Sequence, residues 1–129
     1  MNEGGSASSD DAARELMFAI DRVVPTIWMV RTFLKHADES EDDEDLRAIV
    51  RDLYDFILAL GPVTDQTEPA AYLKSVKKKR GKLKRAAAFY TEIQPEVSGH
   101  TNFEMAARSL TAAVEDIERL MNRDGSASP

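Results

Sequence analysis

The stretch around which we expect the rest of the chain to pack is residues 11–38, DAARELMFAIDRVVPTIWMVRTFLKHAD. Apolar residues recur in it at alternating gaps of four and three positions, which keeps them on one face of an α-helix. Further apolar side chains widen this surface beyond a single stripe. We therefore predict a first helix over 11–37 that several neighbouring helices cover. The stripe consists of Leu16, Ile20, Val23, Ile27, Val30, Leu34 and Ala37.

Pro25 lies inside this helical pattern. A proline removes one backbone hydrogen bond and clashes with the carbonyl four residues earlier, which here belongs to Asp21. The apolar stripe nevertheless keeps its phase across Pro25. This continuity favours one helix with a kink, and the alternative is a break into two shorter helices.

Three more amphipathic patterns follow the first one. Residues 41–60 carry apolar side chains on one face, and Gly61 and a proline come directly after them. The next pattern spans 69–94 and is followed by Pro95, and the last spans 102–122. Each of these three stretches is predicted to form a helix.

Four helices of similar length joined by short connections indicate an all-α fold. We predict a single domain over 11–123 that forms an antiparallel up-down-up-down four-helix bundle. The ends, 1–10 and 124–129, are rich in glycine and serine and lack an apolar anchor. We expect both to be disordered tails, because they cannot offset the entropy lost on ordering.

The composition narrows the classes of function. A chain of 129 residues can bury a core as one domain, and it has no cysteine for disulfides or thiolate metal sites. The start lacks a signal-peptide pattern, and no apolar run approaches the ~18 residues that a membrane span needs. A net charge of −6 argues against nucleic acid and anionic membranes as partners. We expect a soluble cytoplasmic protein with no cofactor, and the sequence identifies no small-molecule ligand.

Two opposite charge blocks stand out. Residues 38–45 hold seven carboxylates in eight positions, and residues 74–85 hold eight of the seventeen lysines and arginines. If the helices over 41–60 and 69–94 are antiparallel neighbours, the two blocks face each other and neutralise each other. The alternative is an anion-binding or nucleic-acid-binding face on the basic helix. Its candidate residues are Lys78, Lys79, Arg80, Lys82 and Arg85.

The two histidines suggest an alternative in which the protein is an enzyme. His36 and His100 fall at the same end of the predicted bundle, near carboxylates that could complete a metal site. However, the Glu-x-x-His spacing of metal-binding bundles is absent. Arg31-Thr-Phe-Leu-Lys-His36 is similar in its Arg-x4-His spacing to the HEPN-type ribonucleases, which are small dimeric helical bundles. This resemblance covers six residues in the first predicted helix, whereas proteins of that family tend to carry the motif near their last helix. We expect neither histidine to be catalytic or to bind a metal.

Trp28 is the only tryptophan, and it lies away from the main apolar stripe. A large aromatic side chain beside Arg31 with polar surroundings is typical of an interface anchor. The alternative is that Pro25 rotates the helix and places Trp28 in the core, against Gly81. We predict a non-enzymatic protein that binds another protein, including a second copy of itself as a homodimer. The candidate interface residues are Met17, Val24, Trp28 and Arg31.

Overall fold

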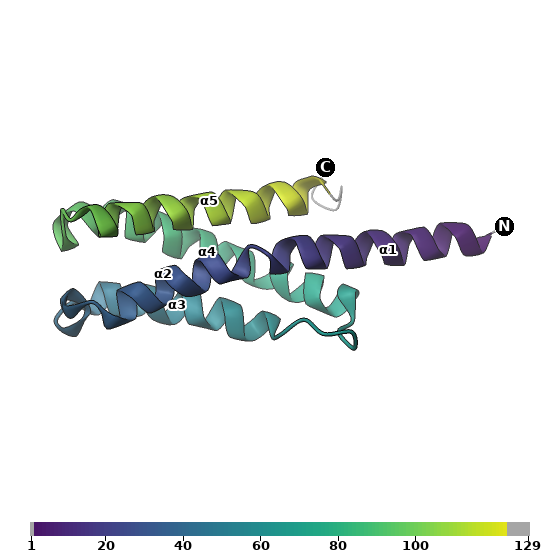
Figure 1. Ribbon diagram of the computed structural model, residues 1–129, viewed down its shortest axis with the longest axis horizontal. Helices are drawn as coiled ribbons and strands as arrows, with labels where there is room; N and C mark the ends of the chain where they lie inside the picture. The colour runs from purple at the N-terminus through teal and green to yellow at the C-terminus, as the bar shows by residue number, and fades with distance from the viewer. Residues whose placement is uncertain (1, 124–129) are drawn as a thin grey trace.

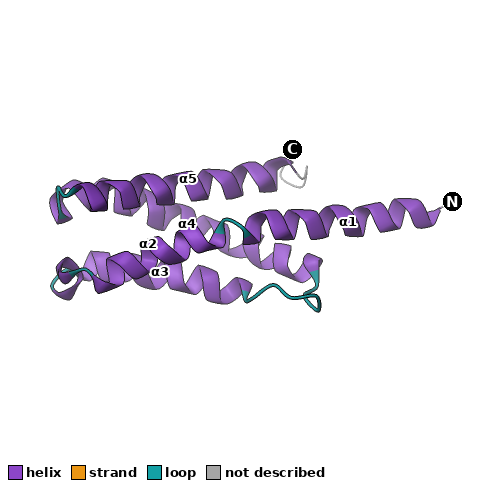
Figure 2. Ribbon diagram, in the orientation of Figure 1, coloured by secondary structure: helices purple, strands orange, loops and turns teal. Residues whose placement is uncertain are grey.

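The structure is a computed structural model that describes residues 2–123, with side chains described from residue 9 onward. All regular structure in these residues is helical, which confirms the all-α prediction (Figure 2). The predicted C-terminal tail, 124–129, lies outside the described residues. No helix among residues 2–123 is long and apolar enough to cross a membrane. The elements are α1 (Asn2–Asp21), α2 (Val24–His36), the short 3-10 helix η1 (Asp38–Glu41), α3 (Glu44–Leu60), α4 (Pro69–Val97) and α5 (Thr101–Arg123).

Four helices enclose the core. Helix α2 packs against α3 and α5, and α4 packs against the same two helices (Figure 1). Helix α1 contacts α4 and α5. The N-terminal part of α1 continues past the ends of the other helices in Figure 1. One face of every α-helix therefore faces a shared interior, and α1 extends beyond it.

The core uses the apolar stripe of residues 11–38. Its half-buried members, Leu16, Val23 and Ala37, pack against the buried ones. Burying a side chain of this size stabilises a fold by roughly 1.5–3 kcal/mol, so the stripe is a main contribution to stability. The buried side chains of α1 and α2 are Met17, Ile20, Ile27, Val30 and Leu34.

The first helical pattern forms two helices in the structure. Helix α1 ends at Asp21 and α2 begins at Val24, where we predicted one kinked helix. Pro25 lies in the first turn of α2, a position where the missing N–H has no helical partner to lose. The N–H of Val23 donates instead to the carbonyl of Ile20 at 2.9 Å. The proline thus marks the start of a new helix.

The N-terminal segment also differs from the prediction. Residues 2–10 are helical and belong to α1, although we expected a disordered tail there. Extending an existing helix adds one hydrogen bond per residue without a new nucleation step. Because 11–21 is already held by the bundle, the helix can propagate toward Asn2. Met1 lies outside the described residues.

The acidic turn before α3 also differs in detail. We predicted a helix from residue 41, but η1 comes first and α3 begins at Glu44. The Asp43 side chain caps α3 by accepting a hydrogen bond from the Leu46 N–H at 3.0 Å. Ser40 is buried, and its hydroxyl donates to the carbonyl of Ala37 at 2.8 Å. The acidic segment is therefore held in a fixed turn.

Pro95 does not end α4, which continues to Val97. A proline ring disrupts only the backbone contact four residues earlier, and this one lies in the last turn. The N–H of Ser98 can therefore still donate to the carbonyl of Gln94 at 3.0 Å. The predicted boundary at residue 94 was one turn short.

Candidate interaction surface on helices α2 and α3

The four predicted interface residues do not form one patch. Met17 is fully buried in the core, at 0% exposure, so it does not belong to an exposed surface. Met17 and Trp28 also belong to two different helices, since α1 ends at Asp21 and α2 begins at Val24. Val24 is half-buried against the core. Trp28 is 40% exposed, and Arg31 is half-buried beside it.

Trp28 and Arg31 form a cluster with Tyr54 of α3. The Arg31 guanidinium carbon lies 4.7 Å from the Trp28 ring centroid and 4.9 Å from the Tyr54 ring centroid. The two ring centroids are 6.4 Å apart, so the three groups form a triangle. Cation–π contacts of this kind contribute ~0.5–1 kcal/mol each at partly exposed sites. Arg31 is thus held in place by two aromatic rings on two helices.

Tyr54 was not among the predicted interface residues. The residue falls between Leu53 and Asp55, off the buried stripe of α3, and is 39% exposed. The available signal was an aromatic residue at a position that helical spacing places outside the core. Helical spacing alone does not predict which residue Tyr54 contacts, because its neighbour depends on how α2 packs against α3.

Helical spacing builds the surface around this cluster. Side chains three or four positions apart lie on one helix face. Leu58, one turn beyond Tyr54, is 64% exposed and extends the apolar end. Positive charges continue the surface in the other direction. We call this surface the α2–α3 face, and its residues are Trp28, Arg31 and Lys35 of α2 and Arg47, Arg51, Tyr54 and Leu58 of α3.

A groove of about 300 Å³ runs along the positive end of the α2–α3 face. Val50 and Tyr54 supply apolar surface to it, and Ser40 lines it from the acidic turn. None of its cations forms an ion pair with a side chain of residues 9–123. The four cations that line the groove are Arg31, Lys35, Arg47 and Arg51.

Arg47 and Arg31 differ in their hydrogen bonds. Arg47 donates from Nη1 to the carbonyls of Ser40 at 3.0 Å and Glu41 at 2.6 Å, which fixes η1 against α3. Arg31 has a buried Nε without a hydrogen-bond partner in the described part of the chain. A buried donor without a partner costs ~1–3 kcal/mol.

The predicted pairing of the two charge blocks is not what the structure shows. Lys82 lies 3.6 Å from a carboxylate oxygen of Asp52 and 3.7 Å from one of Asp55, and Arg80 lies 3.8 Å from Glu118. Asp52 and Asp55 lie seven and ten residues beyond Asp45, so Lys82 faces a part of α3 that comes after the acidic block. Among the described residues, no carboxylate of residues 38–45 forms an ion pair.

The predicted anion-binding residues do lie together on α4. They line a shallow hollow of about 520 Å³ that also includes Glu118. Two of them, Arg80 and Lys82, are in the ion pairs described above. Binding of an anion at this hollow stays a prediction. The residues in question are Lys78, Lys79, Arg80, Lys82 and Arg85.

Both histidines are exposed. The Nδ1 atom of His100 accepts a hydrogen bond from the Asn102 N–H at 3.0 Å, so this side chain caps the start of α5. Within residues 2–123, no group of three or more histidine and carboxylate side chains is placed to hold a metal ion. The alternative of an enzyme that uses His36 or His100 stays a prediction.

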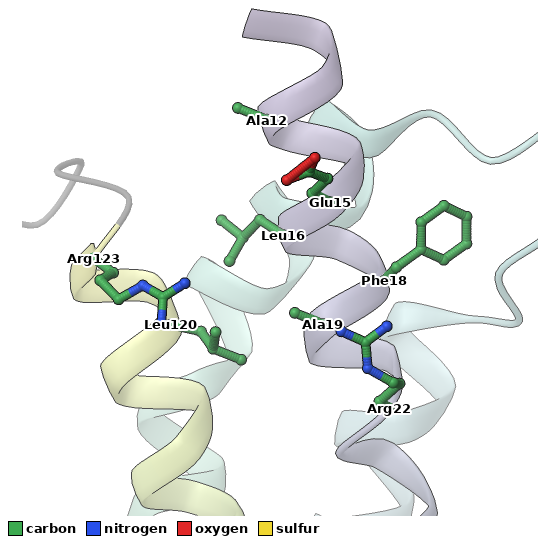
Figure 3. A pocket seen from close by; sticks show the side chains of 8 residues that line it. All are labelled: Ala12, Glu15, Leu16, Phe18, Ala19, Arg22, Leu120 and Arg123. Atoms are coloured by element: carbon green, nitrogen blue, oxygen red, sulfur yellow. The ribbon is translucent and has the colours of Figure 1, made fainter. Parts of the chain in front are cut away.

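A hollow of about 720 Å³ lies where α1 leaves the bundle. Figure 3 shows Leu16 of α1 and Leu120 of α5 on its two sides, while Phe18 points away from Leu120. Arg22 and Arg123 add charge from different helices. The labelled side chains do not converge on one point in this view. The hollow therefore follows from the divergence of α1 and α5, and we assign it no site.

Comparisons with models of known protein families, with curated proteins and with solved structures found no match.

Proposed function

We propose that this protein is not an enzyme and acts by binding another protein through the α2–α3 face, with a second copy of the chain as its partner. The observation that carries this proposal is the Arg31 guanidinium held within 5 Å of two ring centroids at the surface. Tryptophan, tyrosine and arginine are the residues most enriched among interface anchors. The two rings stay about 40% exposed, so a partner can still bury them.

The proposal includes the arrangement of the helices and a cytoplasmic location. We take α2 to α5 as an up-down-up-down antiparallel bundle, which the contacts of each helix with two neighbours support. In such a bundle, two adjacent helices present one continuous face to the outside. The α2–α3 face is continuous in this sense, and one self-complementary face is enough for a two-fold dimer.

Light scattering on the wild type and on Trp28→Ala tests the proposal. We expect a wild-type dimer at tens of micromolar. Removing a buried interface tryptophan costs about 2 kcal/mol, which corresponds to a ~30-fold weaker dimer. Phe89→Ala is the matched control, because Phe89 is an aromatic residue of similar exposure on α4. A wild-type monomer, or equal weakening by the control, would contradict the proposal.

A second variant separates interface from core. Trp28→Ala also removes the contact with Tyr54, so the variant could unfold and its loss of dimer would say nothing about the interface. Leu58→Glu avoids this problem, because Leu58 is largely exposed and contributes little to the core. We expect Leu58→Glu to keep the wild-type helical circular dichroism and melting temperature and to become monomeric. A dimer that tolerates this charge would place the interface elsewhere.

A further inference from the structure

The α2–α3 groove and the acidic turn, residues 38–45, lie next to each other. Ser40 of the acidic turn lines the groove, and Arg47 donates hydrogen bonds to two carbonyls of the same turn. The groove carries four cations and the turn carries seven carboxylates. In the described part of the chain, neither set forms an ion pair with the other. One surface thus holds a positive and a negative region side by side, each without a partner.

Such a surface is self-complementary about a two-fold axis. If the axis passes between the two regions, the acidic turn of each copy faces the groove of the other, and both contacts are identical. Opposite charges then meet twice, which fixes the register and speeds association. An axis through the centre of the groove would instead bring cations against cations. The charge pattern therefore selects one arrangement of the second copy.

We propose that the acidic turn of a second copy docks in the α2–α3 groove, which rests on the self-association proposed above. The exposed carboxylates of the turn, such as Glu41 and Asp42, enter the cationic groove. Asp43 stays on its own chain, where it caps α3. The partner's carboxylates supply acceptors for the groove cations Lys35 and Arg51, which form no ion pair in the described part of the chain. Val50 and Tyr54 give the docked turn an apolar surface.

Arg31 links this docking to Trp28. Its side chain lines the groove and also lies over the Trp28 ring, so the docked turn and the aromatic cluster share one residue. A nucleic acid fits the groove less well than a protein carboxylate. Its phosphates would meet the seven carboxylates of residues 38–45 at the groove's edge, and the whole chain has a net charge of −6.

Exchanging charges between two variants tests this docking. Arg51→Glu places a carboxylate in the groove, and Asp42→Lys places a cation in the acidic turn. Both residues are exposed, so the fold is expected to persist, and circular dichroism checks this. Each variant alone opposes like charges at both contacts and is expected to dimerise at least 10-fold more weakly than the wild type.

A mixture of the two variants is expected to recover the dimer. In the mixed dimer, one contact pairs Glu at position 51 with Lys at position 42, and the other contact is native. Sedimentation velocity should therefore show monomers for each variant alone and a dimer for the mixture. Raising the salt concentration from ~0.05 to ~0.5 M should weaken the wild-type dimer, because exposed charge pairs are screened. Lys84→Glu makes the same charge change on α4 and should leave the dimer intact.

The outcomes separate this inference from the proposed function. If the wild type is a dimer and the Arg51→Glu variant is an equally strong dimer, docking in the groove is overturned and self-association still holds. The same follows if the mixture of Arg51→Glu and Asp42→Lys does not form a dimer. A wild-type protein that is monomeric at low salt overturns both. If Lys84→Glu weakens the dimer as much as Arg51→Glu does, the effect comes from net charge, and docking in the groove is overturned as well.

Discussion

Tyr90 provides a quantitative test of how α4 and α5 pack. It lies in α4, is fully buried, and its hydroxyl donates a hydrogen bond to the Phe103 carbonyl at 2.9 Å. Burial raises the pKa of Tyr90 from 10.0 to about 12. Between these values, the phenol of the unfolded chain ionises while that of the folded chain stays protonated. The folded state then binds more protons, so stability falls as the pH rises above 10.

The perturbation is Tyr90→Phe, which removes both the hydrogen bond and the titration. Near pH 7 the lost hydrogen bond should cost about 1 kcal/mol of unfolding free energy. At pH 11, one pH unit above the unfolded pKa, the wild type has lost about 1 kcal/mol of unfolding free energy through Tyr90. The Tyr90→Phe variant does not lose this stability, because it has no phenol at position 90 to ionise. The stability curves of the two proteins should therefore meet near pH 11.

Urea denaturation followed by circular dichroism at pH 7, 9, 10 and 11 measures both curves. Burial, and to a smaller degree the charge of Asp21, also raises the pKa of Tyr72. That effect and the titration of the lysines are the same in both proteins and cancel in the difference. A difference that stays constant from pH 7 to pH 11 would show that Tyr90 ionises equally in both states. This result would refute the burial of its phenol between α4 and α5.

Two further substitutions test the core and the turn. Leu53→Ala should lower the free energy of unfolding by about 2–5 kcal/mol in urea titrations, because Leu53 is fully buried. Leu58→Ala, on the exposed face of the same helix, should lower it by under ~1 kcal/mol. Similar losses for the two variants would contradict the orientation of α3. Asp43→Ala should lower the free energy of unfolding by about 1 kcal/mol, because it removes the cap on the Leu46 N–H. Asp43→Asn should retain most of this stability. An alanine variant as stable as the wild type would argue against this cap.

Much of the fold could be predicted because it depends on periodicity within single segments. The spacing of apolar residues places Ile20, Ile27 and Leu34 in the core, and the structure confirms this burial. Proline was harder to interpret. A kink and a break at Pro25 remove the same hydrogen bond, and only the packing of α1 and α2 distinguishes them.

The candidate site depends on contacts between helices, which a single sequence does not contain. Trp28 was found because it lies off the apolar stripe, but Tyr54 became part of the site only through the packing of α2 on α3. The partners of the basic run were missed for a similar reason. Lys82 pairs with Asp52 and Asp55, which lie further along α3, and residues 38–45 form no ion pair with the side chains that the structure describes.

Association of two copies through the α2–α3 face at the acidic turn can be tested directly by distances between labels on the two copies. The chain has no cysteine, so a single introduced cysteine can carry a spin label. His36→Cys places the label at the end of α2 beside the acidic turn. Ala88→Cys places it at an exposed position of α4, across the bundle from α2. Both substitutions leave the groove cations unchanged.

Pulsed electron paramagnetic resonance then measures the distance between the labels of the two copies. If the acidic turns dock in the grooves, the His36→Cys labels lie near the two-fold axis and should be a short distance apart, whereas the Ala88→Cys labels on the outer side should be further apart. A shorter distance for the Ala88→Cys label, or no coupling between copies for either label, would contradict this docking.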